Sequence, residues 1–249
     1  MLCLINTVRH RMMSIPSDFL DLPLHRETQD RYFIRKAILA ALRKAMPRFH
    51  GTFLDVGAGV QPYRNMITEG APKITRYLGM DLETNAVAGY RKVTQDLYWD
   101  GGTIPLDDSS VDSAMATEVL EHCPDPGAVL REIARVMRPG GVFFFTVPFL
   151  WPLHDVPYDE YRYTPFALER LVREAGFDEV VVRPHGGWDA SLAQMIGLWA
   201  RRRPMSEAKR TLISRLTLPV VRYLLRHDHV PDPRSSPMVP GLSGTAVRR

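Results

Sequence analysis

The chain has 249 residues, of which 45% are hydrophobic and 24% charged, a composition that suits one α/β domain with an appendage. Two cysteines are too few for a disulfide framework and lack metal-binding spacing, and no stretch approaches the ~20 apolar residues that span a bilayer. Residues 200–249 hold 11 Lys and Arg against 3 Asp and Glu, a charge of +8, so the preceding residues carry −4 of the net +4. This distribution argues against nucleic acid as a partner, because enzymes that act on it usually surround their site with basic residues.

The first predicted helix runs from residue 28 to about residue 46, after an N-terminal extension of residues 1–27. Thr28 can cap its start, and Pro47 ends it. Apolar residues recur along one stripe, which predicts packing on a sheet: Ile34, Ala37, Ile38, Ala41, Leu42 and Ala45.

A glycine-containing turn follows the first predicted strand. Residues 53–56 are a short apolar run, interrupted by Asp55 and followed by Gly57 and Gly59. Glycine suits such a turn because a side chain would block either a positive-φ backbone or the close approach of a ligand. The turn and the predicted helix after it, residues 60–69, therefore form a candidate cradle for a carboxylate or phosphate, and Asp55 can hold a cationic amine.

The rest of the turn indicates which cofactor it binds. A dinucleotide fingerprint requires glycine at its first, third and sixth positions, and Pro62 occupies the sixth. A nicotinamide-dependent oxidoreductase is therefore the less favoured alternative.

Acidic residues follow the next two predicted strands. Residues 77–81 form the second strand, which ends in Asp81, 22 residues beyond Gly59. A carboxylate there suits a ribose, because it accepts hydrogen bonds from two hydroxyls at once. Residues 91–94 are a weak third strand, followed by Asp96.

Strands and helices alternate through the middle of the chain. A fourth strand, residues 113–117, precedes the segment Glu-Val-Leu-Glu-His at 118–122. A helix beginning at Pro126 follows, and the turn Arg-Pro-Gly-Gly at 138–141 leads into a fifth strand, residues 142–147. This alternation predicts a mostly parallel, doubly wound α/β sheet with helices on both faces.

Five phrases carry a resemblance that covers residues 28–183. They are Asp-x-Gly-x-Gly at 55–59, the strand-ending Asp81, Pro-Leu-Asp-Asp-Ser-Ser-Val-Asp at 105–112, Glu-Val-Leu-Glu-His at 118–122 and Arg-Pro-Gly-Gly at 138–141. In this order and spacing, the chain resembles the small-molecule class I S-adenosylmethionine-dependent methyltransferases. The resemblance implies a methyltransferase domain, residues 28–190, with a Rossmann-like seven-stranded sheet. Gln61 replaces the third glycine of the family's first motif, and we expect it to shift the methionine end of the cofactor slightly.

The family's cofactor, S-adenosyl-L-methionine, then lies at the carboxyl ends of the strands. The resemblance places Asp96 at the adenine amino group and Leu97 against the adenine ring. The full set of predicted cofactor-binding residues is Asp55, Gly57, Ala58, Gly59, Asp81, Leu82, Asp96, Leu97 and Glu118. We expect no metal ion.

The segment after the fifth strand, residues 148–165, is the predicted substrate loop, because it is rich in aromatic, histidine, arginine and carboxylate groups. It resembles the substrate-side segment of bacterial methyltransferases often associated with glycan or lipid-linked saccharide assembly. Methyl transfer to a hydroxyl needs an aligned nucleophile and a base. His154, oriented by Asp155, is the predicted base and His122 the second candidate, although a histidine that only packs in the loop is an alternative. Predicted substrate contacts are Trp151, Asp155, Tyr158, Tyr161 and Arg162.

We therefore expect methyl transfer from S-adenosylmethionine to a small-molecule or glycan acceptor, at oxygen. The sequence leaves open a non-catalytic adaptor that binds S-adenosylmethionine, because such a protein would keep the glycine turn and lack only a productive acceptor pocket.

The last predicted region, residues 191–249, is basic. In residues 205–227, apolar residues repeat at helical spacing with arginines between them, and Pro219 should kink the helix. Two interpretations remain: a helical cover on the sheet or substrate site, which we favour, and a helix that lies on an anionic membrane surface. In either case we expect a cytoplasmic protein, in the second peripheral to the inner face of the membrane. Residues 241–249 are a candidate seventh strand.

Overall fold

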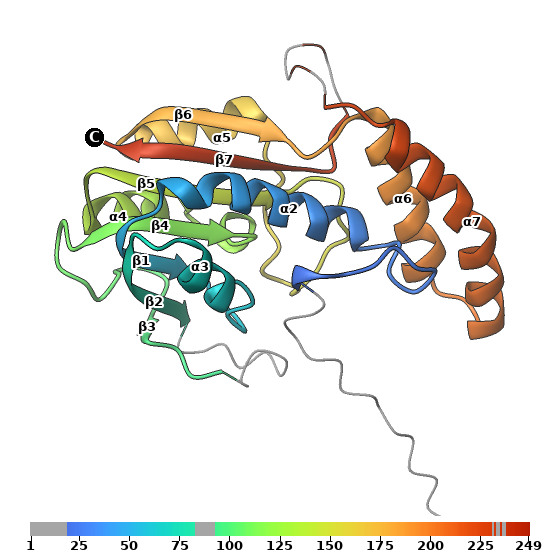
Figure 1. Cartoon of the computed structure of the whole chain (residues 1–249), viewed down its shortest axis with the longest axis horizontal. Coiled ribbons are helices and arrows are strands. Elements are labelled where there is room, and N and C mark those ends of the chain that lie inside the picture. The colour runs from blue at the N-terminus through green and yellow to red at the C-terminus, as the bar shows by residue number, and fades with distance from the viewer. Residues whose placement is uncertain (1–18, 83–92, 231, 233–234, 236–237) are drawn as a thin grey trace, which may run out of the picture.

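The computed structural model describes residues 19–82, 93–230, 232, 235 and 238–249 (Figure 1). The strands are β1 (Gly51–Val56), β2 (Ile74–Leu82), β3 (Leu97–Trp99), β4 (Val111–Thr117), β5 (Met137–Pro148), β6 (Phe177–Pro184) and β7 (Gly241–Arg248). The helices are α2 (Tyr32–Ala45), α3 (Arg64–Gly70), α4 (Pro126–Val136), α5 (Pro165–Glu174), α6 (Trp188–Arg202) and α7 (Glu207–His227), with short 3-10 turns η1 (Met46–Arg48) and η2 (Leu120–His122).

The seven strands form one sheet in the order β3-β2-β1-β4-β5-β7-β6. The pairs from β3 to β5 are parallel, and β7 runs antiparallel to both β5 and β6. The predicted doubly wound, mostly parallel sheet is confirmed, as is the seventh strand at the C-terminal end of the chain.

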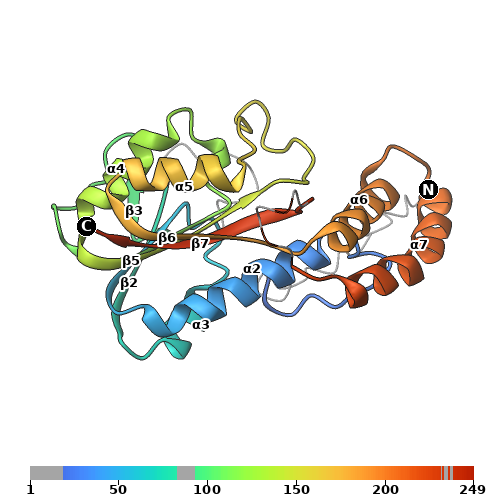
Figure 2. The ribbon, with the colours of Figure 1, turned by 90° about the horizontal axis from the view of Figure 1, so that it is seen from above.

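Helices cover both faces of the sheet, with α4 and α5 on one side and α2 and α3 on the other (Figure 2). The strand sequence serves both layers, since successive side chains of a strand point to opposite faces. In β5, Phe143 and Phe145 lie in the core under α4 and α5, whereas Phe144 lies in the core under α2. All three phenylalanines are buried, which is typical of a strand in the middle of a parallel sheet.

Two helices, α4 and α5, begin directly after a residue whose side chain caps them. Asp125 accepts a hydrogen bond from the Ala128 N–H, so α4 begins at Pro126 as predicted. Thr164 does the same for α5 by accepting from the Ala167 N–H. In both helices a proline occupies the first position, where no N–H is needed.

The predicted starts of two other helices are wrong. The Thr28 hydroxyl instead accepts from the His25 N–H and donates to the Pro23 carbonyl, so it stabilises a turn, and α2 begins at Tyr32. The helix after the glycine turn begins at Arg64 rather than residue 60. Gly59 and Gln61 have φ values of 55° and 52°, which a right-handed helix does not allow.

The predicted third strand is also wrong. Residues 91 and 92 lie outside the described residues, and Val93 and Thr94 belong to no strand. The third strand is β3, Leu97–Trp99, which pairs with Met80 to Leu82 of β2. Asp96 therefore precedes this strand, whereas the prediction had placed it after one.

The helices α6 and α7 form a hairpin at the end of the sheet where β1, β2 and β4 point (Figures 1 and 2). The predicted helix of residues 205–227 is observed as Glu207–His227 and continues through Pro219. It packs on α6, and Gln29 holds it by donating to the Ser214 carbonyl at 3.1 Å. The favoured interpretation had the helix packed on the sheet or over the substrate site, and α6 is instead its main partner. None of the helices in the described part of the chain has the length and apolarity that crossing a bilayer requires.

Candidate cofactor and acceptor site

The glycine turn follows β1 and is hydrogen-bonded to the end of β2. Gly57 and Gly59 have φ values of 67° and 55°, in the left-handed region that favours glycine. A Cβ on Gly57 would lie 2.5 Å from Cγ2 of Val119, so a larger residue has no room. The Ala58 N–H donates to the Met80 carbonyl at 2.9 Å, which ties the turn to the neighbouring strand.

Asp81 fixes the same turn from the end of β2. Its Oδ2 accepts from the Gly59 N–H at 2.8 Å, and its Oδ1 accepts from the Leu82 N–H at 2.7 Å. Both carboxylate oxygens therefore bind backbone N–H groups at the turn and at the end of β2. The sequence placed Asp81 at the ribose, and the structure places it next to the predicted cradle.

Asp55 is buried in the sheet directly below the turn. The Tyr77 hydroxyl donates to its Oδ2, and its Oδ1 has no hydrogen-bond partner among the described residues. Burial raises the pKa of this carboxyl from 3.8 to about 7. A cationic amine at Oδ1 would supply the partner that this oxygen lacks, so the site fits the amino group of the expected cofactor.

Two glutamines complete the turn: Gln61, which replaces the third glycine, and Gln95, which the prediction did not assign. Gln61 donates to Oε1 of Gln95 at 2.7 Å, and Gln95 donates to the Gly59 carbonyl at 2.7 Å. A Cβ on Gly79 would lie 2.8 Å from Nε2 of Gln61, so the absence of a side chain there makes room for this pair. Gln61 thus occupies the third-glycine position with its side chain held against β2. No sequence periodicity indicates that pairing, because the two glutamines are far apart in the chain.

Asp96 directly precedes β3 and joins two neighbouring elements. Its Oδ2 accepts from the Gly79 N–H at 2.8 Å and from Arg64 at 2.8 Å, so it links β2 to α3. The residue that follows β3 is Asp100, whose Oδ1 accepts from the N–H groups of Gly102 and Thr103. Leu97 belongs to β3 and packs against the core under α4 and α5.

Two glutamates follow β4 on the other side of the turn. Glu118 has a φ of 56°, strained for a residue with a side chain, and accepts from the Thr146 hydroxyl at 2.8 Å. Glu121 is fully buried, and neither carboxylate oxygen has a hydrogen-bond partner among the described residues. Burial raises the pKa of both groups, and the charge of Glu118 raises that of Glu121 further.

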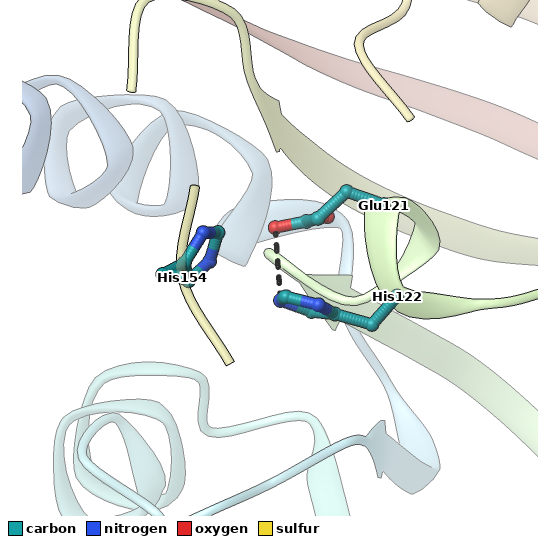
Figure 3. A group of neighbouring side chains, drawn as sticks. All are labelled: Glu121, His122 and His154. Atoms are coloured by element: carbon teal, nitrogen blue, oxygen red, sulfur yellow. Dashed lines mark ion pairs between the residues drawn. The ribbon is translucent and has the colours of Figure 1, made fainter. Parts of the chain in front are cut away.

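His122 and His154 meet beside Glu121 (Figure 3). Their ring centroids lie 4.7 Å apart, with the ring planes at 74°. Nδ1 of His122 lies 3.1 Å from the Tyr158 carbonyl, and Nε2 lies 3.7 Å from Glu121 Oε1. Burial lowers the pKa of His122. The structure thus brings both predicted base candidates together, from segments that follow β4 and β5.

The orienting partner of His154 is Asp159, and the prediction of Asp155 is wrong. Nδ1 of His154 lies 3.0 Å from Asp159 Oδ2, whereas Asp155 is exposed. Arg162 binds both carboxylate oxygens of Asp159, at 2.6 and 2.8 Å, and holds the pKa of that carboxyl well below its usual range. A loop residue five positions away is hard to choose from sequence, because the choice depends on how the loop folds back.

The other predicted substrate residues differ in exposure. Tyr158 is exposed, whereas the Tyr161 hydroxyl donates to the Pro124 carbonyl and its ring stacks on Tyr163. Trp151 is partly buried, with the Arg202 guanidinium 5.8 Å from its ring centroid. The hairpin of α6 and α7 therefore touches the substrate loop at Trp151.

Comparisons with known proteins agree with this geometry. Residues 54–145 match the family described as methyltransferase domain. An uncharacterized methyltransferase of Mycolicibacterium paratuberculosis is 30% identical over 193 residues, which cover 70% of this chain and 72% of that protein. An uncharacterized 37.1 kDa protein in a transposon of Streptomyces fradiae is 30% identical over 130 residues, 48% of this chain, but the chain spans only 37% of its length.

A solved structure from Thermotoga maritima has the same fold. It is an S-adenosylmethionine-dependent methyltransferase, described as a possible histamine N-methyltransferase, with a TM-score of 0.56 at 15% identity. The match covers 90% of this chain and 94% of that one. Together with the glycine turn and the sheet order, these matches establish that the chain belongs to the class I S-adenosylmethionine-dependent methyltransferases.

The raised pKa of Asp55 predicts a pH-dependent stability. Between about pH 4 and pH 7 the folded protein binds more protons at this carboxyl than the unfolded chain, so the free energy of unfolding falls as the pH rises. Asp55→Asn should make the decrease in the free energy of unfolding between about pH 4 and pH 7 smaller by roughly 1–4 kcal/mol. Urea titrations at these two pH values measure it. Asp178→Asn, which changes an exposed carboxylate, serves as the control, and an Asp55→Asn profile that matches the wild type would contradict the prediction.

Proposed function

We propose that this chain transfers a methyl group from S-adenosylmethionine to an oxygen of a small-molecule or saccharide acceptor. The observation that carries the proposal is the placement of the His122 and His154 pair on the segments after β4 and β5, at the same edge of the sheet as the glycine turn after β1. A ligand that spans this edge would have its cofactor end at the turn and its acceptor end at the histidines.

The residues around the turn have chemically distinct roles in this proposal. Backbone groups of residues 57–59, including Ala58, approach the methionine part, and Asp55 binds its amino group. Asp81, with Leu82 beside it, accepts hydrogen bonds from the ribose. We assign the adenine to Asp96 and Leu97, as the resemblance implies, and Asp100, directly after β3, is the alternative.

The acceptor chemistry follows from the histidine pair. Bound S-adenosylmethionine supplies a methyl group on a sulfonium, and transfer forms a C–O bond while the C–S electron pair returns to sulfur. When no metal ion is bound near the histidines, His154 takes the hydroxyl proton at Nε2, because Asp159 occupies its Nδ1 side. Arg162 keeps Asp159 in position by binding both of its carboxylate oxygens. We assign Glu118, which directly follows β4, to the cofactor.

The two alternative functions receive less support. A nicotinamide-dependent enzyme would need a close helix start at the glycine turn, and the left-handed Gln61 followed by Pro62 delays α3 to Arg64. A non-catalytic adaptor would have no use for a fully buried Glu121 without hydrogen bonds beside two histidines, because that arrangement costs stability.

The role of Asp81 is tested by cofactor affinity. Asp81→Ala removes a buried, charged hydrogen-bond acceptor, so S-adenosylmethionine should bind more weakly by at least ~1–3 kcal/mol in calorimetry. Glu69→Ala, which changes an exposed carboxylate on α3, should leave the affinity unchanged. Unchanged binding in Asp81→Ala would remove the ribose assignment, and tight binding of NAD in place of S-adenosylmethionine would remove the proposed function.

The role of His154 is tested by turnover once an acceptor has been found by screening saccharides and small hydroxyl compounds. His154→Ala should lower turnover by ~10²-fold or more and leave S-adenosylmethionine affinity nearly intact. Asp159→Asn should lower turnover less and shift its pH profile, since it disturbs only the orientation of the imidazole. Wild-type turnover in His154→Ala would transfer the base role to His122, and His50→Ala is the control.

We also propose that the hairpin contacts an anionic membrane surface through α7. Four apolar residues of α7 are exposed by 48–67% and recur at helical spacing: Leu212, Leu216, Val220 and Tyr223. Exposed arginines flank these residues of α7: Arg215, Arg222 and Arg226. Four apolar residues of α6 are exposed as well: Trp188, Leu192, Met195 and Trp199. The exposed apolar and cationic groups of α7 complement acyl chains and anionic headgroups.

Liposome flotation tests this contact. The protein should float with anionic vesicles at low salt and be released by added salt, since each arginine near the surface contributes about 1 kcal/mol. Leu216→Asp should abolish flotation, whereas Phe166→Asp, at an exposed apolar residue of α5, should not. If the intact protein stays in the buffer at low salt, α7 makes no membrane contact.

A further inference from the structure

The group formed by Glu121, His122 and His154 has the composition of a metal site (Figure 3). Each residue offers one ligand atom, and these atoms all lie within 4.8 Å of one another. Bonds of about 2.1 Å to one ion place its ligand atoms up to about 4.2 Å apart, so a small side-chain rotation brings all three into range. The two histidines and the carboxylate come from η2 and from the loop after β5.

A hydrogen bond at Nδ1 of each histidine leaves the lone pair on Nε2. The Tyr158 carbonyl can only accept, so Nδ1 of His122 carries the proton and Nε2 carries the lone pair. Asp159, paired with Arg162, sets the same tautomer in His154. A carboxylate or carbonyl behind each imidazole is the arrangement that orients histidine ligands in metal sites.

Glu121 supplies an independent observation. Its side chain is fully buried and neither carboxylate oxygen accepts a hydrogen bond from any described residue. Nε2 of His122 lies 3.7 Å from its Oε1. A buried carboxylate without hydrogen bonds is costly unless it is paired or coordinates a metal ion.

We propose that Glu121, His122 and His154 bind one divalent transition-metal ion. Two imidazole nitrogens and one carboxylate oxygen suit first-row ions from Mn²⁺ to Zn²⁺, and three protein ligands leave positions open for water or for an acceptor oxygen. The expectation of no metal rested on the cysteines and on sequence spacing, and His154 lies 32 residues beyond His122.

The bound ion would activate the acceptor hydroxyl for methyl transfer, an inference that rests on the proposed function. An acceptor hydroxyl on an open position would lose its proton more readily, because the ion stabilises the oxyanion. The proton would pass to solvent water, and His154 would act as a ligand rather than as the base. This favours acceptors with a hydroxyl that can coordinate a metal, such as those with neighbouring hydroxyl groups.

Calorimetry with Co²⁺ on the chelator-treated full chain tests the site, and visible absorbance reports the ligands. We expect one equivalent of Co²⁺, bound at least ~10-fold more weakly by Glu121→Gln and by His122→Ala. Glu160→Gln, which changes an exposed carboxylate in the same loop, should bind like the wild type. No Co²⁺ binding by the wild type, or equal affinity in both ligand variants, would overturn the proposal.

Controls separate this result from folding and from the proposed function. Circular dichroism checks each variant, and because the His122 side chain is 23% exposed, His122→Ala carries the test if Glu121→Gln does not fold. The same preparations are titrated with S-adenosylmethionine. Cofactor binding without Co²⁺ binding rejects only the metal site, whereas Co²⁺ binding without cofactor binding rejects only the proposed function.

Discussion

Burial of the central strands on both faces is the constraint that organises this protein. In β1, β4 and β5 most side chains are buried and apolar, because helices cover the sheet above and below. The polar side chains of the candidate site therefore lie where the strands end. The glycine turn, Asp81, Glu118 and the loop after β5 all follow strand ends at one edge of the sheet.

Three buried carboxyl groups lie near the same edge. Asp55 and Glu121 are buried carboxyls with unpartnered oxygens among the described residues, and Asp159 is a buried carboxylate that is paired with Arg162. An unpaired buried charge destabilises a protein, whereas a bound cation removes the cost. The cofactor amine at Asp55 and a metal ion at Glu121 are thus two instances of one physical argument: the fold leaves anionic positions that ligands complete.

The hairpin of α6 and α7 is fixed to the rest of the domain by side-chain contacts. Gln29 and Asp30 anchor it to the segment before α2, through Ser214 and Arg202. Arg202 also lies over Trp151 of the substrate loop, so the hairpin and the acceptor side of the site are in contact. A surface bound by α7 would therefore lie within reach of the loop that carries His154, which suits an acceptor presented at a membrane.

Local sequence patterns determined much of the fold. The apolar runs, the glycine turn and the cap at Asp125 specify their own structure through nearest-neighbour geometry, and they predicted the sheet and most of its strands. Patterns failed where distant contacts decide: β3 begins at Leu97, where the chain pairs with β2, and α3 starts late, after a left-handed Gln61 whose side chain bonds to Gln95. The same holds for the site. Sequence indicated His122 and His154 separately, but only the tertiary structure joined them to Glu121 and chose Asp159 over Asp155, because loop closure brings together residues that no short pattern connects.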